Sequence, residues 1–421
     1  MAKPSTNSDD ATALHRSLVD NLLSAGSVQT PRVEEAFRKV PRHLFLPGVS
    51  LDQVYSDVSI PTKHLEDQVV SSSSQPAMMA IMLEQLRLEP GHRVLEIGSG
   101  TGYNAALMAH LAGDTGRVVT VELDEDLAAT ARENLSQAGF GRVQVICDDG
   151  AFGVPGEAPY DRIILTVGAR DIAPAWREQL KPGGRLLLPL SLAGGGQLSV
   201  AWEHAGGHLA SVSVKPCGFM MLRGTFAAPD RAIQLGPEPD LQIYVDDKSL
   251  VDSEAVYSSL TGLAQDFRTN VRVTQLEIYS GLVLWLALHG VGFCSLVATG
   301  DWAERNIVPD LFRMSSEGGA CSTIGLHSNG SLCVLMPHLD QTSPADVSFD
   351  STPFELFVRR FGPDDSLVQQ LTNQIIDWDI SGRPNLENIR LRAYPLDSDY
   401  AATSRESVIT NRWTRLVVDW Q

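Results

Sequence analysis

Cysteine is scarce in this chain, and its few cysteines stand far apart. Five occur among 421 residues, at positions 147, 217, 294, 321 and 333, and no two form a C-x-x-C pair. Such spacing favours neither a disulfide framework nor a zinc site. His289, His327 and His338 do not have the spacing of metal ligands either. The sequence therefore predicts no metal site, and it predicts reduced thiols that are mostly buried.

A membrane-spanning run and an export signal are also missing. The longest apolar stretch, Gly281 to Val297, contains His289 and two internal glycines. It is shorter than the ~20 apolar residues that a bilayer-spanning helix requires. We therefore expect this stretch to be buried in the core of a second domain. We also expect the protein to be cytoplasmic, without contact to a membrane.

Basic residues are too few for a nucleic-acid-binding surface. The chain has 33 Lys and Arg against 51 Asp and Glu, which gives a net charge of −18. Binding to phosphates needs a basic surface, so this balance argues against a nucleic-acid partner. The apolar fraction of 43% and the charged fraction of 20% are those of a globular protein. The length is ample for two domains.

The most informative motif is a glycine-rich turn between an apolar strand and a helix. Residues 94–103 read Val-Leu-Glu-Ile-Gly-Ser-Gly-Thr-Gly-Tyr, with glycines at 98, 100 and 102. Glycines allow the backbone to approach a ligand, and the start of the next helix offers unpaired N–H groups. A dinucleotide fingerprint would place its third glycine at position 103, where this chain has Tyr103. Together with Glu96, the spacing instead favours S-adenosylmethionine; the alternative is a tight turn that binds no ligand.

The ends of the next predicted strands carry further marks of a ligand site. Strands 117–121, 143–147 and 162–167 each run into polar or small residues. These are Glu122 after the first, Asp148, Asp149 and Gly150 after the second, and Thr166, Val167, Gly168 and Ala169 at the end of the third. Helix-length segments separate the strands, so the sequence predicts an α/β fold with a parallel sheet. Ligands in such sheets bind at the carboxyl ends of the strands, where Glu122 is placed for ribose hydroxyls and Asp148 for an adenine amino group.

Further motifs give the chain a resemblance to a known family. They are Arg32 to Arg42 (Arg-Val-Glu-Glu-Ala-Phe-Arg-Lys-Val-Pro-Arg), Ser74-Gln75-Pro76, Glu96 to Tyr103, Ala158 to Ile163 and Gln179 to Leu186. In this order and combination they resemble the protein-L-isoaspartate O-methyltransferases across about residues 10 to 224. The resemblance implies a Rossmann-like class I methyltransferase domain, which uses S-adenosylmethionine and releases S-adenosylhomocysteine.

The resemblance also implies roles for individual residues. With neighbouring residues of the same motifs, the predicted cofactor site consists of Glu96, Gly98, Ser99, Gly100, Tyr103, Glu122, Asp148, Asp149, Gly150 and Thr166. Ser74 would lie beside the transferred methyl group and the substrate carboxylate, with Ser73 or Ser72 as a helper. The predicted substrate contacts are Ser72, His64, Val167, Gly168 and Ala169.

The serine run has a structural interpretation as well. Ser73 or Ser74 would be a good N-cap for the helix that is expected at 77–86. The two roles are compatible, because a helix start is also a favourable place for an anionic substrate. The substrate carboxylate, with a pKa of about 4, is ionised at neutral pH and needs no general base. The sequence therefore nominates no catalytic histidine or glutamate.

Two features depart from the family pattern. Residues 57–74 are longer than the compact glycine-containing loop by which the family reaches its serine, and nearly 200 residues follow the matching region. Both features resemble a longer subgroup that methylates an aspartate of a ribosomally made precursor peptide. In that subgroup the ester closes to an aspartimide, which can hydrolyse to isoaspartate.

We expect a methyltransferase domain at 1–224, a turn-rich connection at 225–235 and an accessory mixed α/β domain at 236–421. In the accessory domain the apolar pattern predicts helices at 254–265 and 364–378. It also predicts strands at 389–393 and 416–418. Size and resemblance suggest that this domain serves peptide recognition or dimerisation, and the sequence leaves the oligomeric state open.

Three functions remain in view at this point. The first is methylation of an aspartyl carboxylate in a modified or macrocyclic precursor peptide. The second is an isoaspartyl repair methyltransferase with an accessory domain. The third is a catalytically silent cofactor-binding subunit that recruits a partner, against which the intact glycine motif and Glu122 argue. The first two share a peptide substrate.

Overall fold

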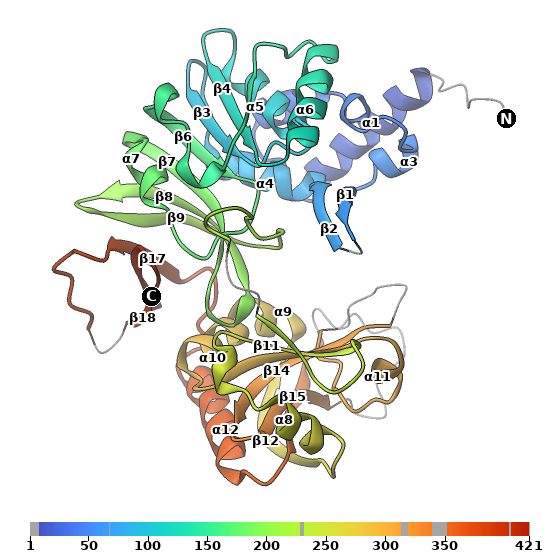
Figure 1. Cartoon of the computed structure of the whole chain (residues 1–421), viewed down its shortest axis with the longest axis vertical. Coiled ribbons are helices and arrows are strands. Elements are labelled where there is room, and N and C mark those ends of the chain that lie inside the picture. Colours follow the sequence, from blue (N-terminus) through green and yellow to red (C-terminus); the bar gives the residue numbers. More distant parts are fainter. Residues whose placement is uncertain are drawn as a thin grey trace.

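The computed structural model of the protein describes residues 8–66, 68–227, 231–312, 319–338, 352–403 and 406–420. These residues form two lobes, each built around one large β-sheet (Figure 1). The sheet of the upper lobe in Figure 1 has ten strands and that of the lower lobe has seven. A separate two-stranded hairpin projects from the upper lobe. The expected connection at 225–235 includes residues 228–230, which lie outside the described residues.

Five parallel strands form the half of the first sheet that positions the site. They are β3 (Arg93–Ile97), β4 (Arg117–Glu122), β5 (Gln144–Cys147), β6 (Tyr160–Leu165) and β7 (Leu180–Ser191). Their order is β5-β4-β3-β6-β7. Val94 and Val118 pack in one hydrophobic cluster, while their neighbours Leu95 and Val119 pack in another, so both faces of the sheet are covered. This arrangement confirms the predicted α/β fold.

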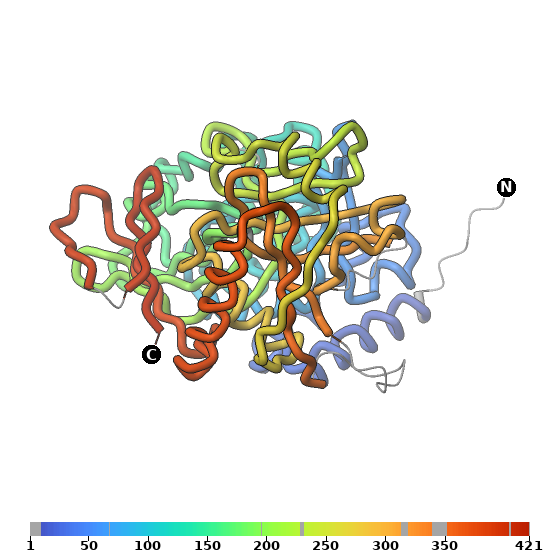
Figure 2. The backbone as a smooth tube through the Cα atoms, turned by 90° about the horizontal axis from the view of Figure 1, so that it is seen from below, coloured from blue at the N-terminus to red at the C-terminus, as the bar shows by residue number. Residues whose placement is uncertain are grey.

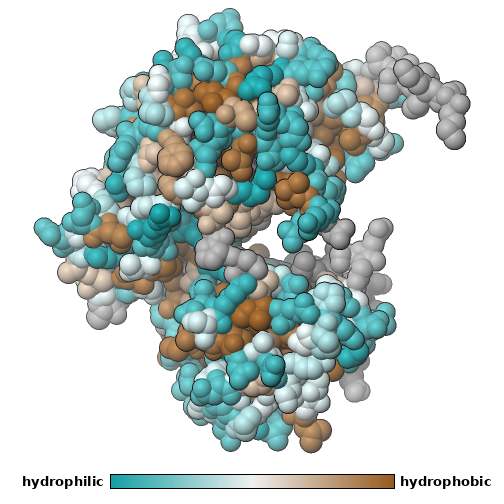
Figure 3. All heavy atoms as spheres, in the orientation of Figure 1, coloured by the Kyte–Doolittle hydropathy of each residue, from teal (hydrophilic) through white to brown (hydrophobic). Residues whose placement is uncertain are grey.

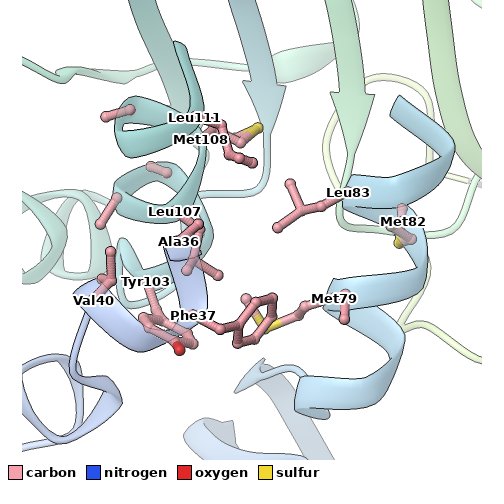
Figure 4. Close-up of a cluster of buried hydrophobic side chains, with 14 of the residues drawn as sticks. Ala36, Phe37, Val40, Met79, Met82, Leu83, Tyr103, Leu107, Met108 and Leu111 are labelled. Carbon is pink, nitrogen blue, oxygen red and sulfur yellow. The ribbon is translucent and has the colours of Figure 1, made fainter. Parts of the chain in front are cut away.

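Helices cover one face of these strands, and a short helix covers part of the other. The helical elements of this lobe are α1 (Ser8–Ser24), α2 (Pro31–Lys39), η1 (Arg42–Phe45), α3 (Leu51–Val54), α4 (Pro76–Leu86), α5 (Tyr103–Ala112), α6 (Glu125–Gln137), η2 (Gly150–Phe152), η3 (Pro155–Glu157) and α7 (Pro174–Glu178). Nine of the ten residues of α5 are buried, which makes it the central helix of its layer. Figure 4 shows Phe37 of α2, Met79 of α4 and Tyr103 of α5 gathered in this core. The Tyr103 ring meets Phe37 edge to face, with 6.4 Å between the centroids.

The other half of the first sheet is antiparallel and includes the end of the chain. It contains β8 (Gln197–Ala205), β9 (His208–Cys217), β17 (Ile389–Pro395), β18 (Ser407–Thr410) and β19 (Thr414–Trp420). From β7 outward the order is β8-β9-β17-β19-β18. Figure 2 shows the last strands, in red, beside the green strands of the first lobe. The expected range 236–421 therefore contributes strands to two sheets. The alternating pattern at 389–393 predicted a strand, but it contained no information on its partner.

A buried carboxylate ties the end of the chain to the first sheet. Asp171 follows β6 and accepts hydrogen bonds from the backbone N–H of Trp413 at 2.6 Å and from the hydroxyl of Thr414. It also accepts the N–H of Ile172 at 2.7 Å. Burial raises the pKa of this carboxyl. The three hydrogen bonds thus stabilise a carboxylate that few water molecules reach.

Removal of this carboxylate should destabilise the protein. We expect Asp171→Ala to lower the free energy of unfolding by about 2–3 kcal/mol, because three hydrogen bonds to a charged group are lost. Urea denaturation monitored by tryptophan fluorescence measures the change. Asp397→Ala, at an exposed aspartate of the same C-terminal region, is the matched control. An equal effect of the two substitutions would contradict the role of Asp171.

The second lobe has a mixed α/β structure, as expected. Its sheet consists of β10 (Ala232–Gln234), β11 (Leu241–Val245), β12 (Gln265–Val273), β13 (Phe293–Ala298), β14 (Cys321–Ser328), β15 (Ser331–His338) and β16 (Phe354–Phe361). The order is β10-β11-β13-β14-β15-β16-β12, and every pair is antiparallel. The helical elements are η5 (Lys248–Leu250), α8 (Ser253–Leu260), α9 (Gln275–Glu277), η6 (Ile278–Leu282), α10 (Val283–His289), α11 (Gly300–Glu304) and α12 (Asp365–Ile380).

The sequence patterns predicted some elements of this lobe correctly and others incorrectly. The helix predicted at 364–378 is α12, whose N-cap Asp364 accepts the N–H of Ser366. The helix predicted at 254–265 ends at Leu260, and its supposed core residue Leu263 is 96% exposed. A turn follows Leu260 because Gln265 already begins β12 at the sheet edge. The apolar stretch 281–297, which runs through η6, α10 and β13, is only partly buried, and Val291 within it is 83% exposed.

The lobes meet at a tight turn between β7 and β8. This turn is η4 (Ala193–Gly195), where Gly194 adopts φ +74°. An added Cβ at Gly194 would lie 2.3 Å from Cε1 of Phe293 in the second lobe, so only glycine fits. The face shown in Figure 3 is mostly hydrophilic, with hydrophobic atoms in separate patches. Within the described residues, no helix has the length and apolar character needed to cross a membrane.

Candidate active site

The glycine turn after β3 leaves space at the carboxyl end of the sheet. Gly98, Gly100 and Gly102 have φ values of +100°, +50° and +87°, which L side chains rarely adopt. An added Cβ at Gly98 would lie 2.6 Å from the hydroxyl of Thr166, which donates to the Gly98 carbonyl. The nearest atom to a Cβ at Gly100 would be the Ser72 carbonyl at 3.7 Å. The Gly100 backbone therefore borders an open cradle that can admit a ligand.

The cradle is part of a cavity that we call the glycine-loop cavity. It is lined by residues from 70–74, 97–104, 121–123, 149–150, 164–167 and 219–223, together with Met79 and Met82. Of the predicted site residues, those that line it are Ser72, Ser73, Ser74, Gly98, Ser99, Gly100, Tyr103, Glu122, Asp149, Gly150, Thr166 and Val167. Six segments far apart in the sequence thus meet at one end of the parallel strands.

Glu122 presents a buried carboxylate to this cavity. Its side chain accepts the N–H of Gly100 at 2.9 Å on Oε2 and the N–H of Leu123 at 3.0 Å on Oε1. The residue is only 7% exposed, and burial raises its pKa. Oε1 also accepts the N–H of Asp124 at 3.4 Å, whereas Oε2 keeps a further lone pair that can accept a hydroxyl proton. Glu122 is thus placed as an acceptor for a diol such as a ribose.

Glu96 lies beneath the glycine turn, outside the cavity lining. Its carboxyl group accepts Nδ2 of Asn104 at 2.8 Å and the hydroxyl of Thr120 at 2.6 Å. It is fully buried, and burial raises its pKa from the usual value of 4.5 to about 7. Glu96 supports the turn from below in this structure, and its predicted contact with the cofactor stays a prediction.

The buried Glu96 should make stability depend on pH. Because its pKa is higher in the folded protein, its stabilising contribution is fully present below pH 4.5 and is lost as the pH rises through about 7. We expect Glu96→Gln, which cannot ionise, to reduce this loss. Urea midpoints measured from pH 5 to pH 8 compare the variant with the wild type. Parallel curves for the two proteins would rule out this titration.

The two aspartates after β5 differ in their surroundings. Asp148 is exposed, lies outside the cavity lining and accepts the N–H of Asp149. Asp149 lines the cavity, and its carboxylate accepts the N–H groups of Ala151 at 2.9 Å and Thr225 at 2.7 Å. Asp149 therefore links this corner of the site to the segment after residue 223. The predicted adenine contact of Asp148 stays a prediction.

The longer loop before the serines is a β-hairpin. It consists of β1 (Ile60–Leu65) and β2 (Gln68–Ser73), and residue 67 between them lies outside the described residues. Along β2 the side chains alternate, so Ser71 and Ser73 are buried, whereas Ser72 and Ser74 are half-buried. Ser72 and Ser74 also line a second cavity, the serine cleft, whose other walls come from 59–61, 75–78 and 216–220, together with Val69 and Thr166. These two serines therefore face both cavities.

The capping interpretation of the serines is wrong. Helix α4 begins at Pro76, its N-cap is Gln75, and no side chain of the cap residue bonds to the helix. Asp57 takes this role instead, because it accepts the N–H of Ala77 at 2.8 Å and Nε2 of Gln75 at 3.0 Å. Ser74 thus ends the hairpin just before the helix and is not needed to cap it.

Three predicted substrate residues lie outside both cavity linings. His64 is exposed on β1, opposite Val69, and it lines neither cavity, although Val69 lines the serine cleft. Gly168 exchanges backbone hydrogen bonds with Met220 and Leu222, and Ala169 exchanges them with β7. These backbone groups hold the wall of the site rather than line it. The predicted contacts of the three residues with substrate stay predictions.

Sequence reasoning missed one wall of the site. Residues 219–223 (Phe-Met-Met-Leu-Arg) line the glycine-loop cavity, and Phe219 and Met220 also line the serine cleft. The side chain of Gln197 holds this segment by bonding to both the N–H and the carbonyl of Phe219. The segment ended an expected domain and was therefore interpreted as a boundary. Its apolar run directly after a strand was the available signal.

A carboxylate joins the two walls of the site. Asp124 Oδ2 lies 2.9 Å from Lys63 Nζ on the hairpin and 2.7 Å from Arg223 Nη2 on the opposite wall. Lys63 also contacts Asp126 at 2.6 Å. The hydrogen bonds from Arg223 and Lys63 lower the pKa of Asp124. These ion pairs hold the hairpin and segment 219–223 together two residues beyond Glu122.

Removing the ion pairs of Lys63 should loosen the contact between the two walls of the site. We expect Lys63→Ala to speed the dissociation of S-adenosylhomocysteine several-fold, because a partly buried ion pair no longer joins the walls. Stopped-flow displacement measures the rate. Lys181→Ala is the matched control, because Lys181 pairs with Asp161 at 2.8 Å near the opposite end of the parallel strands. Equal rates in the wild type and Lys63→Ala would show that the bridge does not restrain the ligand.

The geometry defines a class of protein. A parallel sheet with a glycine turn after its central strand and an acidic residue ending the next strand is the site of the class I S-adenosylmethionine-dependent methyltransferases. Residues 13–225, half of the chain, match the model of the family "Protein-L-isoaspartate(D-aspartate) O-methyltransferase". The chain therefore belongs to the protein-L-isoaspartate O-methyltransferase family, and it is an S-adenosylmethionine-dependent protein carboxyl O-methyltransferase.

Several proteins with this name are similar to the chain. The protein-L-isoaspartate O-methyltransferase of Methanopyrus kandleri is 47% identical over 174 residues, which cover 41% of this chain and 75% of the relative. That of Hyperthermus butylicus is 39% identical, with 50% and 89% of the two chains covered. That of Thermotoga maritima is 41% identical, with 38% of this chain and 50% of the relative covered.

Two solved structures are among those similar to the chain. A protein-L-isoaspartate O-methyltransferase matches 90% of this chain and 96% of its own, with 23% identity and a TM-score of 0.49. A Plasmodium falciparum protein solved with S-adenosyl-L-homocysteine matches 50% of this chain and 98% of its own, with 21% identity and a TM-score of 0.45.

Among the described residues, no group of three His, Cys, Asp or Glu side chains is arranged to hold a metal ion.

The residues of the glycine-loop cavity suit the methyl donor of the family. The cradle at Gly100 leaves room for close approach to the backbone, and Glu122 offers the acceptors that a ribose diol needs. Ser99 is held in the turn by a 2.7 Å hydrogen bond with the hydroxyl of Thr120, which in turn donates to Glu96. These residues fit the S-adenosylmethionine that the family uses, and the contact of Glu122 with its ribose stays a prediction.

Proposed function

We propose that the protein methylates the free carboxylate of isoaspartyl residues in peptides or proteins. The observation that carries this proposal is the position of Ser72 and Ser74, which line both the glycine-loop cavity and the serine cleft. A carboxylate bound at Ser74 in the cleft would face the methyl donor in the cavity. Family membership and the names of the relatives support the isoaspartyl substrate more than a precursor peptide.

Methyl transfer requires the protein mainly to position the reacting groups and to exclude water. When bound, S-adenosylmethionine supplies an electrophilic methyl group on a sulfonium sulfur. The substrate carboxylate is ionised at neutral pH, so its oxygen can form the new C–O bond as the C–S bond breaks, without loss of a proton. Ser74 would hold the carboxylate about 3 Å from the methyl carbon. Phe219 and Met220 provide apolar walls that exclude water.

Incubation with two matched peptides tests this function. The full-length protein is mixed with S-adenosylmethionine and either a linear isoaspartyl peptide or its aspartyl counterpart, and products are read by mass. We expect the mass of one methyl group on the isoaspartyl peptide alone. The ester can then lose methanol as the next backbone nitrogen attacks it to give a succinimide. Cofactor binding without methylation of any peptide would instead support the silent recruitment subunit.

A second candidate function is methylation of an aspartate in a modified or macrocyclic precursor peptide. The observation that favours it is the hairpin β1–β2, which replaces the compact loop of the family and forms a wall of the serine cleft. The second lobe does not separate the two functions, since half of the Thermotoga maritima relative also lies outside the matched segment. A constrained aspartyl peptide is the third arm of the test, and methylation of it alone would favour this candidate.

We assign peptide recognition or dimerisation to residues 236–388 as part of the same proposal. This range contains the seven-stranded sheet apart from its first strand. Residues 389–420 are better grouped with the methyltransferase sheet, to which they add three strands. Light scattering with and without peptide tests the two roles, because only dimerisation raises the mass in the absence of peptide.

A further inference from the structure

Arg42 is a fully buried arginine directly behind the serine run. It begins η1, and its side chain is 0% exposed. Its two terminal nitrogens donate to the backbone carbonyls of Val54 at 2.9 Å, Ser56 at 3.3 Å, Val58 at 3.2 Å, Ser73 at 3.3 Å and Ser74 at 3.0 Å. Nη2 also lies 3.4 Å from the hydroxyl of Ser73. One guanidinium thus holds the segment before the hairpin and the residues that end it.

This guanidinium has no carboxylate partner among the described residues. All of its hydrogen-bond partners are carbonyls and one hydroxyl, and its Nε has no partner. Asp57 acts on it electrostatically without a hydrogen bond, while its two oxygens accept the N–H of Ala77 and Nε2 of Gln75. Arginine stays charged even when buried. A buried charge with no carboxylate in direct contact is incompletely compensated, so an anion that binds nearby would stabilise it further.

The substrate site is the nearest place for such an anion. Arg42 Nη2 bonds to the Ser74 carbonyl, while Ser74 itself lines both cavities, so only the backbone of Ser74 separates the charge from the cleft. The other cations at the walls, Lys63 and Arg223, are already paired with Asp124. The net charge of the whole chain is −18, which repels an anionic peptide unless the site supplies local positive charge.

We propose that Arg42 is a positioning residue for the substrate carboxylate. Its hydrogen bonds fix the backbone of Ser73 and Ser74, and its charge, which no described carboxylate contacts directly, attracts the carboxylate that binds on the other side of Ser74. This inference rests on the proposed function, since it requires a carboxylate substrate at Ser74. It goes further because it assigns the preference for a charged substrate to a residue that does not line the cleft.

The test separates charge from geometry by two variants and two peptides. Arg42→Lys keeps the charge, whereas Arg42→Gln removes it and keeps N–H donors for the carbonyls. The peptides are the isoaspartyl peptide and the neutral peptide with an amide in place of its free carboxylate. Their dissociation constants are measured by calorimetry on full-length protein saturated with S-adenosylhomocysteine. Arg185→Gln is the matched control, because Arg185 is also buried but pairs with Glu203.

We expect the wild type, Arg42→Lys and Arg185→Gln to prefer the charged peptide by about tenfold, as two charges in a partly buried site attract each other. Arg42→Gln should bind both peptides alike, with its affinity for the neutral peptide unchanged. A charge preference that survives in Arg42→Gln would overturn the proposal.

If Arg42→Gln does not fold, the binding preference of the wild-type protein provides the test by itself. Its preference should persist in about 0.5 M NaCl, because buried charges are screened little, and loss of the preference in salt would assign it to exposed cations.

Failure of the proposed function gives a different result. If the wild type binds neither peptide and methylates neither, the assignment of a carboxylate substrate fails, and the role of Arg42 fails with it. If the wild type methylates the isoaspartyl peptide but shows no preference for the charged peptide in binding, only the role of Arg42 fails.

Discussion

Replacing Ser74 with alanine is expected to lower kcat/KM for methyl transfer by about a hundredfold, with little change in cofactor affinity. The hydroxyl of Ser74 is placed to hold the substrate carboxylate, and misplacement of a reacting group by about 1 Å costs on the order of a hundredfold in rate. The fold should tolerate this change. Arg42 holds Ser74 through its carbonyl, and Asp57 supplies the cap of the next helix.

The neighbouring serine provides a matched control for this prediction. Ser73 is only 4% exposed, and its hydroxyl lies 3.4 Å from Arg42 Nη2 on the buried face of the strand. Ser73→Ala should therefore retain most of the activity. Initial rates with the isoaspartyl peptide and calorimetry with S-adenosylhomocysteine measure both quantities. Equal losses of rate and cofactor affinity in Ser74→Ala would show that Ser74 serves only the structure of the loop.

Replacing Glu122 with glutamine should weaken cofactor binding by about ten- to a hundredfold, which corresponds to about 1–3 kcal/mol. Glutamine retains one acceptor oxygen but brings an NH2 group to a position where Gly100 and Leu123 already present N–H donors. The variant therefore loses an acceptor for the ribose and places donors against each other. Calorimetry with S-adenosylhomocysteine measures the dissociation constant.

Glu125→Gln is the control for the loss of one negative charge. Glu125 is exposed in the first turn of α6, three residues after Glu122, and it does not line the cavity. Its replacement should leave the cofactor affinity unchanged. Unchanged affinity in Glu122→Gln would refute the ribose contact, whereas a similar loss in both variants would indicate only a long-range effect of charge.

The first sheet could be predicted because its signals are local. A buried parallel strand needs a continuous apolar run, and the turns between its strands need glycine or polar residues, so the runs at 93–97 and 117–122 were recognisable. The partner of β17 could not be predicted, because strand pairing across 180 residues depends on which sheet edge remains open. The second lobe was least predictable, since its strands pair antiparallel and its apolar runs also fit a helix.

In the candidate site, too, only residues whose position follows from a local motif could be assigned from the sequence. Residues in short motifs, such as Gly98 and Glu122, could be assigned because spacing along the chain fixes their position at the sheet. Arg42 also lies in a recognised motif, but its role could not be predicted, because its partners come from residues 54–58 and 73–74. The substrate contact of His64 stays a prediction, because residue type alone does not tell which way a hairpin turns its side chains.

The return of the last strands to the first sheet has a consequence for biosynthesis. During translation β9 is made long before β17, so the methyltransferase sheet keeps an unpaired edge until residues 389–395 have left the ribosome. Open sheet edges invite association with other chains. A ribosome that stalls late in the message would release a chain with its glycine turn and serines complete but one sheet edge bare. Such a chain would be prone to associate through this edge, although every residue of its candidate site is present.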